Sequence, residues 1–163
     1  MSEGESKVAV ISSNTEIACL LVPLLDNTLI LPTVSVAEMA SMQPIGSLEN
    51  SPPWLLGFYE WRNTKVPVIS YEGISGGPVT PLNPQGRMAV LNNTGVNSEL
   101  PFIAIPTQGI PRMVRVAEAD ISENTDRNAR PYDDMQVKVG LEEFTLPDVT
   151  ALEQACIDSG VVI

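Results

Sequence analysis

Short apolar runs, rich in Val and Ile, recur along the chain and are separated by Gly, Pro, Asn and Asp. The run at residues 17–25 is followed by Asp26-Asn27 and a second run at residues 28–31. This pattern predicts a hairpin of two buried strands. A buried helix is the alternative, but Pro23 disfavours it because proline costs about 3 kcal/mol inside a helix.

The same pattern predicts further strands, each bounded by turn residues. They cover residues 8–11, 34–37, 58–61, 65–71, 88–91, 100–106, 113–116 and 136–139. Residues 52–56 predict one helical turn, because proline is favoured at the first helical position. Residues 118–134 are polar and charged and predict a loop.

The C-terminal segment, residues 146–157, predicts a short amphipathic helix. Val149, Leu152 and Cys156 lie at helical spacing, and Asp148 lies near the start, where the helix dipole favours a carboxylate. Short strands at regular spacing, with helix confined to the C-terminus, predict an all-β barrel or sandwich.

The Gly- and Pro-rich stretch at residues 73–86 predicts a connector between two lobes. We therefore expect a single domain over residues 1–163, with a first lobe at 1–72 and a second at 87–163. A chain of 163 residues with 44% hydrophobic side chains can bury a core without a metal or a disulfide.

The charge balance argues against nucleic acid as a partner. Nine Lys and Arg residues against twenty Asp and Glu residues give a net charge of −11, which repels phosphate backbones. The apolar runs are shorter than the roughly 18 residues of a membrane-spanning helix, so we expect no membrane insertion. The acidic N-terminal residues differ from a signal peptide, and we expect a cytoplasmic protein.

The sequence lacks histidine, which is the commonest general base and metal ligand. Cys19 and Cys156 lie far apart in apolar surroundings, which fits buried, inert thiols rather than a metal site. We therefore predict no catalytic, cofactor-binding or metal-ligating residues. A hydrolase or transferase that uses adjacent acids remains an alternative. Neighbouring strand residues point to opposite faces of a sheet, however, so solvated surface acids are favoured over a catalytic pair. The acids it would use are Asp133, Asp134, Glu142 and Glu143.

The most distinctive pattern lies between Leu29 and Tyr71. The segments LPTVSVAEM and SPPWLLGFYEWRNTKVPVISY resemble CheW-type chemotaxis coupling proteins. The segment FIAIPTQGIPRMVRV resembles their second-lobe strands and is similar to the ChpC/PilI-like adaptors of type IV pilus chemosensory systems. The residues that match in order and spacing are Leu31, Pro32, Val36, Glu38, Gly57, Arg62, Pro67 and Val68.

This resemblance implies two small five-stranded β-barrel lobes packed on a shared core, with a short C-terminal helix. It implies a non-enzymatic adaptor of a bacterial two-component pathway, which drives chemotaxis or the twitching motility of type IV pili. One face would dock a CheA-type histidine kinase, and another would touch the cytoplasmic tip of a chemoreceptor. The implied partner-binding residues are Val34, Val36, Glu38, Gly57, Phe58, Arg62 and Asn63.

Glu38 and Arg62 are expected to form an exposed ion pair, with Trp61 packing the corner beside it. Two residues depart from the family pattern. Asn63 replaces the glycine that follows the arginine, which asparagine's tolerance of positive φ permits, and Ser70 replaces an acidic residue. A small-molecule or lipid-binding β-barrel is the alternative, and it requires a large internal cavity, whereas a coupling protein has barrels filled by side chains.

Overall fold

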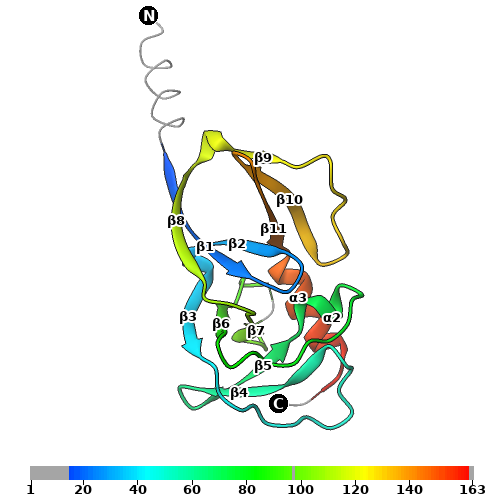
Figure 1. Ribbon diagram of the computed structural model, residues 1–163. Coiled ribbons are helices and arrows are strands. Elements are labelled where there is room, and N and C mark those ends of the chain that lie inside the picture. The colour runs from blue at the N-terminus through cyan, green and yellow to red at the C-terminus, as the bar shows by residue number, and fades with distance from the viewer. Residues whose placement is uncertain (1–14, 97, 162–163) are drawn as a thin grey trace, which may run out of the picture.

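The computed structural model, which describes residues 15–96 and 98–161, contains two β-sheets, one above the other in Figure 1. Sheet A has the strand order β8-β1-β2-β11-β10-β9, and sheet B the order β3-β6-β7-β5-β4. The strands of sheet A are β1 (Glu16–Pro23), β2 (Thr28–Pro32), β8 (Arg112–Ala117), β9 (Ile121–Glu123), β10 (Asp133–Val139) and β11 (Glu142–Pro147). Those of sheet B are β3 (Val36–Ser41), β4 (Leu55–Trp61), β5 (Thr64–Ile69), β6 (Arg87–Asn92) and β7 (Phe102–Pro106).

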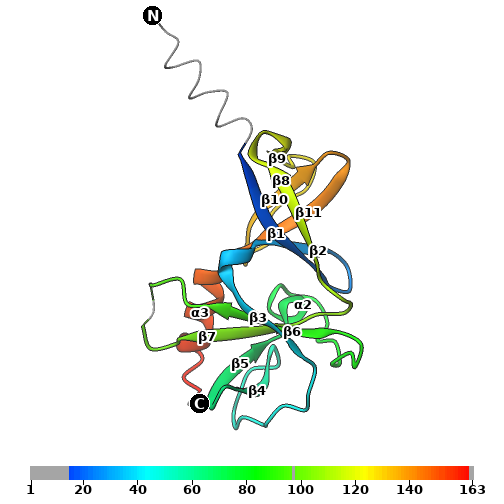
Figure 2. The same ribbon diagram turned by 90° about the vertical axis from the view of Figure 1, so that its left-hand side faces the viewer.

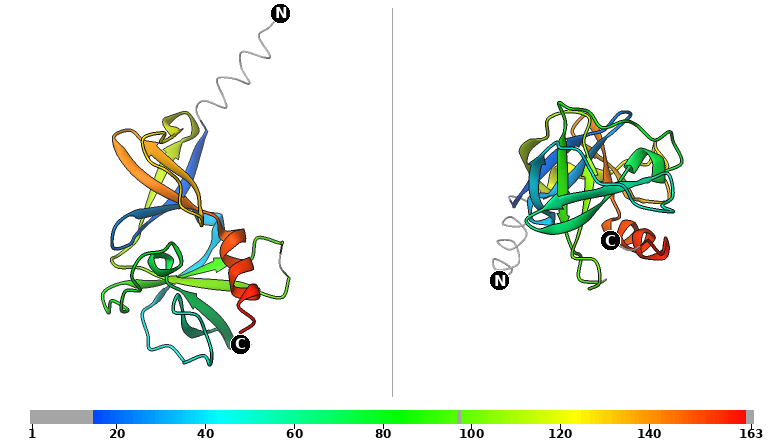
Figure 3. Two further views of the ribbon diagram at one scale, coloured as in Figure 1. Left: turned by 90° about the vertical axis from the view of Figure 1, so that its right-hand side faces the viewer. Right: turned by 90° about the horizontal axis from the view of Figure 1, so that it is seen from below.

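Two helices complete the described chain. The short helix α2 (Tyr71–Ile74) follows sheet B, and α3 (Val149–Asp158) follows sheet A. The side chain of Asp148 accepts a hydrogen bond from the Ala151 backbone N–H at 3.0 Å, which confirms the predicted start of the C-terminal helix. Figure 3 shows α3 alongside the strands of sheet B.

The two sheets do not divide at residues 73–86, so the expected lobes at 1–72 and 87–163 are wrong. Sheet A is built from both ends of the described chain, because β8 pairs with β1 and β11 pairs in parallel with β2. Sheet B is built from the middle, and residues 73–86 connect α2 to β6 within that half. In Figure 2 the chain leaves the upper sheet after β2 and enters the lower sheet at β3. A Gly- and Pro-rich loop indicates a break in regular structure but not which strands pair across it.

Most predicted strands are confirmed with small changes of bounds, including the antiparallel hairpin of β1 and β2. Residues 33–35 form a 3-10 turn instead of the start of a strand, and residue 55 already belongs to β4 instead of a helical turn. The predicted loop at 118–134 contains β9, and β11 was not predicted. The predicted strand at residues 8–11 lies outside the described residues.

Each sheet is curled. In each, one bent segment of the chain pairs with two different strands, one on either side of its bend. Sheet A has six paired strands instead of five, and its edge strands β8 and β9 are joined by a 3-10 turn at Glu118–Asp120. One run of chain therefore pairs with β1 through its first half and with β10 through its second. In sheet B an isolated bridge joins Gly46, which lies beyond β3, to Phe58 of β4. Among the described residues, neither sheet forms a closed barrel in which every strand pairs with a neighbour on both sides.

A shared apolar core lies between the sheets, as expected. Each lobe also has a small core of its own, but the faces that the two sheets turn toward each other are buried in the shared core. A fully buried Leu or Ile side chain contributes about 1.5–3 kcal/mol. The core includes Val22, Leu29 and Leu31 of sheet A, Leu55, Ile69, Leu91, Ile103 and Ile105 of sheet B, and Tyr71, Ile74, Leu152 and Cys156 of the helices.

Each helix carries one buried glutamate, which accepts hydrogen bonds from a turn of the sheet that the helix does not follow. Glu72 of α2, which follows sheet B, accepts a hydrogen bond from the backbone N–H of Leu25, in the turn between β1 and β2, at 3.1 Å. Glu153 of α3, which follows sheet A, accepts bonds from the backbone N–H (3.1 Å) and hydroxyl (2.7 Å) of Thr94, between β6 and β7. These reciprocal bonds fix the two lobes relative to each other.

A buried hydrogen-bond network also joins α2 to sheet A. The Tyr71 hydroxyl donates to Asp133 Oδ1 at 2.6 Å, and the backbone N–H of Arg130 donates to Asp133 Oδ2 at 2.8 Å. Burial by itself raises the pKa of the Asp133 carboxyl. The bonds from Tyr71 and Arg130, together with the Arg130 charge, outweigh burial and hold that pKa below its ordinary value.

Tyr71→Phe is expected to lower the free energy of unfolding by about 1–3 kcal/mol at pH 7, because it removes a donor from a buried carboxylate. A carboxyl whose pKa is lower when folded stabilises fully above its unfolded pKa of about 3.9 and loses that contribution as pH falls through the folded pKa. The difference between wild type and variant should therefore shrink below about pH 4.

Urea unfolding between pH 7 and pH 2.5 measures this difference. Tyr59→Phe is the control, because the Tyr59 hydroxyl donates to the carbonyl oxygen of Ser41 at 2.7 Å and not to a carboxylate. A Tyr71→Phe deficit as independent of pH as that of the control would contradict the role given to Asp133.

Candidate partner-binding surface

The fold brings Glu38 and Arg62 together although they are 24 residues apart in the sequence. Glu38 lies on β3 and Arg62 in the turn after β4, and these strands are the two edges of sheet B. The curl of the sheet lets the edges meet, with Arg62 Nη2 3.3 Å from Glu38 Oε1. The side chains are 71% and 43% exposed, so the expected surface ion pair is confirmed.

Arg62 and Asn63 form a two-residue hairpin turn. Trp61 pairs with Thr64, and the φ angles of Arg62 and Asn63 are 48° and 63°. A turn with positive φ at both central residues matches the right-handed twist of the flanking strands. Asparagine tolerates this conformation, as expected, whereas Arg62 is held in a region that costs about 1–3 kcal/mol. The strain on Arg62 was not predicted.

Trp61 connects both charged side chains. Its indole Nε1 donates a hydrogen bond to Glu38 Oε1 at 2.8 Å, and the Arg62 guanidinium lies 4.9 Å from the centre of its ring. The ring also packs edge-on against Phe102, with ring centres 4.8 Å apart. Trp61 thus packs the corner, as expected. We call Glu38, Trp61 and Arg62 the charged corner.

The remaining predicted residues differ in exposure. Val34 is 83% exposed, in the 3-10 turn before β3, whereas Val36 packs against the shared core. Phe58 is half-buried, with the Lys65 ammonium 4.8 Å from the centre of its ring. Gly57 is buried at φ 155°, and a Cβ placed there would lie 2.1 Å from the Gly46 carbonyl oxygen. Gly57 therefore shapes the lobe and offers no side chain to a partner.

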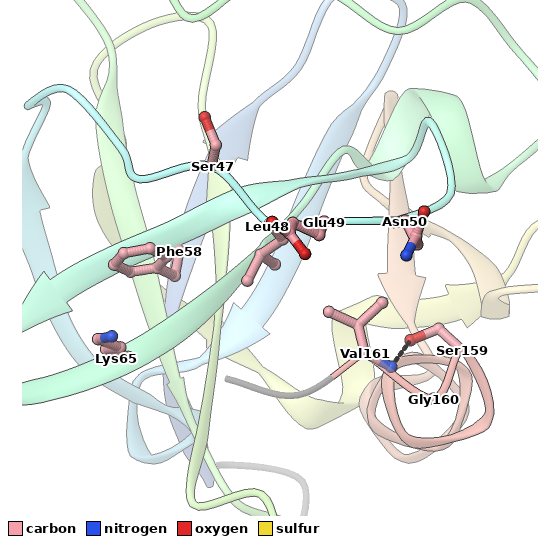
Figure 4. A pocket seen from close by; sticks show the side chains of 9 residues that line it. All are labelled: Ser47, Leu48, Glu49, Asn50, Phe58, Lys65, Ser159, Gly160 and Val161. Carbon is pink, nitrogen blue, oxygen red and sulfur yellow. Dashed lines mark hydrogen bonds between the residues drawn. The ribbon is translucent and has the colours of Figure 1, made fainter.

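A hollow of about 520 Å³ lies beside Phe58, and Figure 4 shows Leu48, Phe58 and Val161 around it. Glu49 is the one acid among its lining residues, so it holds no pair of carboxylates. A second cavity, inside the lobe of sheet A, is wholly apolar and measures about 180 Å³. It is smaller than the 300–1,000 Å³ typical of ligand pockets, so this cavity is too small to be the binding site of a lipid-binding barrel.

The acids considered for catalysis do not converge. Asp133 is buried and Asp134 is exposed, as alternation along a strand requires. Glu142 pairs with Arg112 at 3.7 Å, and Glu143 pairs with Arg127 at 3.6 Å. Within residues 15–96 and 98–161, no three acidic or thiol side chains are grouped so that they could hold a metal ion.

Both cysteines are buried and free. Burial raises the pKa of Cys19, and burial followed by the charge of Glu153 raises that of Cys156 to about 12. Thiols held protonated in this way are poor nucleophiles and poor metal ligands, which fits the expectation of inert cysteines. No helix of the described chain has the length and apolarity needed to cross a membrane.

The chain is a mainly β protein. Its two curled sheets form two lobes around a shared core, and one lobe carries the charged corner. Residues 18–152 match the CheW-like domain, and the chain belongs to this family. The fold is similar to the crystal structure of the scaffolding protein TtCheW from Thermoanaerobacter tengcongensis. The TM-score is 0.68, with 12% identity, over 82% of this chain and 84% of that chain. Comparison with curated proteins gave no match.

Gly57→Ala is expected to lower the free energy of unfolding by about 2–4 kcal/mol, because the backbone is strained for any other residue and the added methyl meets a carbonyl. Gly140→Ala is the matched control, since Gly140 also has positive φ (63°) but a Cβ there meets open space. Its expected cost is about 1 kcal/mol. Chemical unfolding measures both, and equal stability of the two variants would contradict the packing role of Gly57.

Proposed function

We propose that the protein is a non-enzymatic adaptor that couples chemoreceptors to a CheA-type histidine kinase. The observation that carries this proposal is the charged corner, held on the surface of a CheW-like domain by a strained hairpin turn. The resemblance of residues 102–116 to pilus-type adaptors supports an output through type IV pili and twitching motility. Such an adaptor works in the cytoplasm, where receptor tips and kinase meet.

The corner has the properties of a docking site that selects its partner. The two-residue hairpin turn requires a positive φ at position 62, but Asn, Asp or Gly meets this requirement at less cost than arginine. An exposed ion pair contributes only about 0.2–1 kcal/mol to stability, so folding alone gives little reason to place an arginine there. Strain of this kind is found where a surface is preorganised for function. Charges at interfaces set partner choice and association rate more than affinity.

Arg62 is one of the few basic residues in the middle of an acidic chain. Against a net charge of −11, the segment from residue 33 to residue 106 holds only three basic residues: Arg62, Lys65 and Arg87. Arg62 and Lys65 both belong to the hairpin of β4 and β5 or its turn. In the proposed complex, one partner docks on this hairpin through Glu38, Phe58, Arg62 and Asn63. Val34 and Val36 add apolar contact area beside it.

Arg62→Glu is expected to leave the fold intact and to reduce capture of the kinase or the receptor more than tenfold. Exposed charge changes cost little stability, whereas like charges juxtaposed in an interface cost several kcal/mol. The measurement is a pull-down from extract of the native cell, with quantitative identification of the captured proteins.

Arg127→Glu is the matched control, because Arg127 also forms a surface ion pair, on the lobe of sheet A. It should capture both partners at wild-type levels. The site assignment fails if a folded Arg62→Glu protein captures both partners normally. The adaptor function fails if the wild-type protein captures neither a histidine kinase nor a chemoreceptor, and the receptor's identity decides between pilus and flagellar output.

A further inference from the structure

We propose that Trp61 is the positioning residue of the charged corner, and that partner docking depends on it through Glu38 and Arg62. This inference rests on the proposed adaptor function and names a determinant of the same site. Trp61 does not need to touch the partner. Its role is to hold the two charged groups in the arrangement that the partner meets.

The Glu38 carboxylate is held more closely by Trp61 than by Arg62. Oxygen Oε1 of Glu38 accepts the indole N–H at 2.8 Å and the guanidinium at 3.3 Å. An N–H···O distance of 2.8 Å is near the optimum, and 3.3 Å is beyond the usual range. The indole is thus the principal anchor of the carboxylate, and the carboxylate in turn orients the arginine.

The Trp61 ring is itself fixed. It is half-buried, packs against the apolar core inside the lobe of sheet B, and lies at 70° to the Phe102 ring, with the ring centres 4.8 Å apart. It also ends the ladder of β4 and β5, opposite Thr64 and directly before the turn. A side chain held by packing, on a residue held by backbone pairing, provides a rigid base for Glu38 and Arg62, whose side chains are 43% and 71% exposed.

Arg62 is 71% exposed and gains its order from two sides, the Trp61 ring at 4.9 Å and the Glu38 carboxylate at 3.3 Å. A flexible arginine would lose rotamer freedom when it docks. Ordering such a side chain beforehand raises affinity by about 2- to 10-fold, which is the effect expected of Trp61. The ion pair alone, at an exposed position, does not hold the side chain in one place.

The arrangement is tested in solution without a partner. The chain has two tryptophans, Trp54 and Trp61, so the 1H–15N spectrum of the full chain contains two indole signals. Glu38→Ala should shift the Trp61 indole signal and speed its exchange with solvent, and leave the Trp54 signal unchanged. Trp61→Leu should remove the ring-current shift of the Arg62 side-chain protons. An unmoved Trp61 signal in Glu38→Ala would overturn the proposal.

The dependence of docking on Trp61 is tested by the pull-down from native extract. Trp61→Phe keeps an aromatic ring but loses the N–H donor, and Trp61→Leu loses both. Capture of the kinase or the receptor should fall about 2- to 10-fold for Trp61→Leu and by less for Trp61→Phe. Trp54→Phe, in the shared core, is the control and should bind like wild type, with all variants checked for cooperative unfolding.

The outcomes separate this inference from the function on which it rests. If Arg62→Glu loses capture while Trp61→Leu binds like wild type, docking does not depend on Trp61 and the positioning role is overturned. If wild type captures neither partner, the adaptor function fails, and the spectra still decide whether Trp61 holds the corner.

Discussion

The apolar surface between the two sheets is the constraint on which the rest of the structure depends. Both sheets and both described helices contribute to one core. The chain begins sheet A, builds sheet B and then returns to complete sheet A, so the strands that finish sheet A follow the whole of sheet B in the sequence. The buried bonds of Tyr71, Glu72 and Glu153 then fix how the lobes sit, because a buried polar group without its partner is costly.

This arrangement explains how the charged corner arises at the surface. Burial of one face of sheet B against the shared core and curling around its own small core bring its two edge strands to the same place. Glu38 from one edge and Arg62 from the turn at the other then meet over Trp61. The charged corner is thus a consequence of sheet curvature, and Gly57, which permits the close approach of Gly46, is part of its cause.

The sequence predicted the elements better than their pairing. Turn residues such as Asp26-Asn27 and the helical spacing of Leu152 and Cys156 act locally, and the hairpin and the helix they predict are confirmed. The division of the lobes depends on contacts such as Leu29 with Thr145, far apart in the chain, and no local pattern encodes those.

The candidate site was predicted through the family resemblance and not through chemistry. The meeting of Glu38 and Arg62 is confirmed. The hydrogen bond of Trp61 to Glu38 and its ring contact with Arg62 could not be foreseen, because a tryptophan beside a turn is compatible with simple packing. The positive φ of Arg62 was missed for a related reason. An Asn after an Arg signals a turn, but only strand register shows that both residues occupy its centre.

The most direct test of the proposed docking site is hydrogen–deuterium exchange of the wild-type protein, alone and mixed with the CheA-type kinase or the chemoreceptor tip that we propose as its partners. The account predicts that one of these partners protects the backbone of residues 34–41 and 57–65, with little change in the loop at residues 124–132. Protection confined to other segments, with residues 57–65 exchanging as fast as in the free protein, would contradict it.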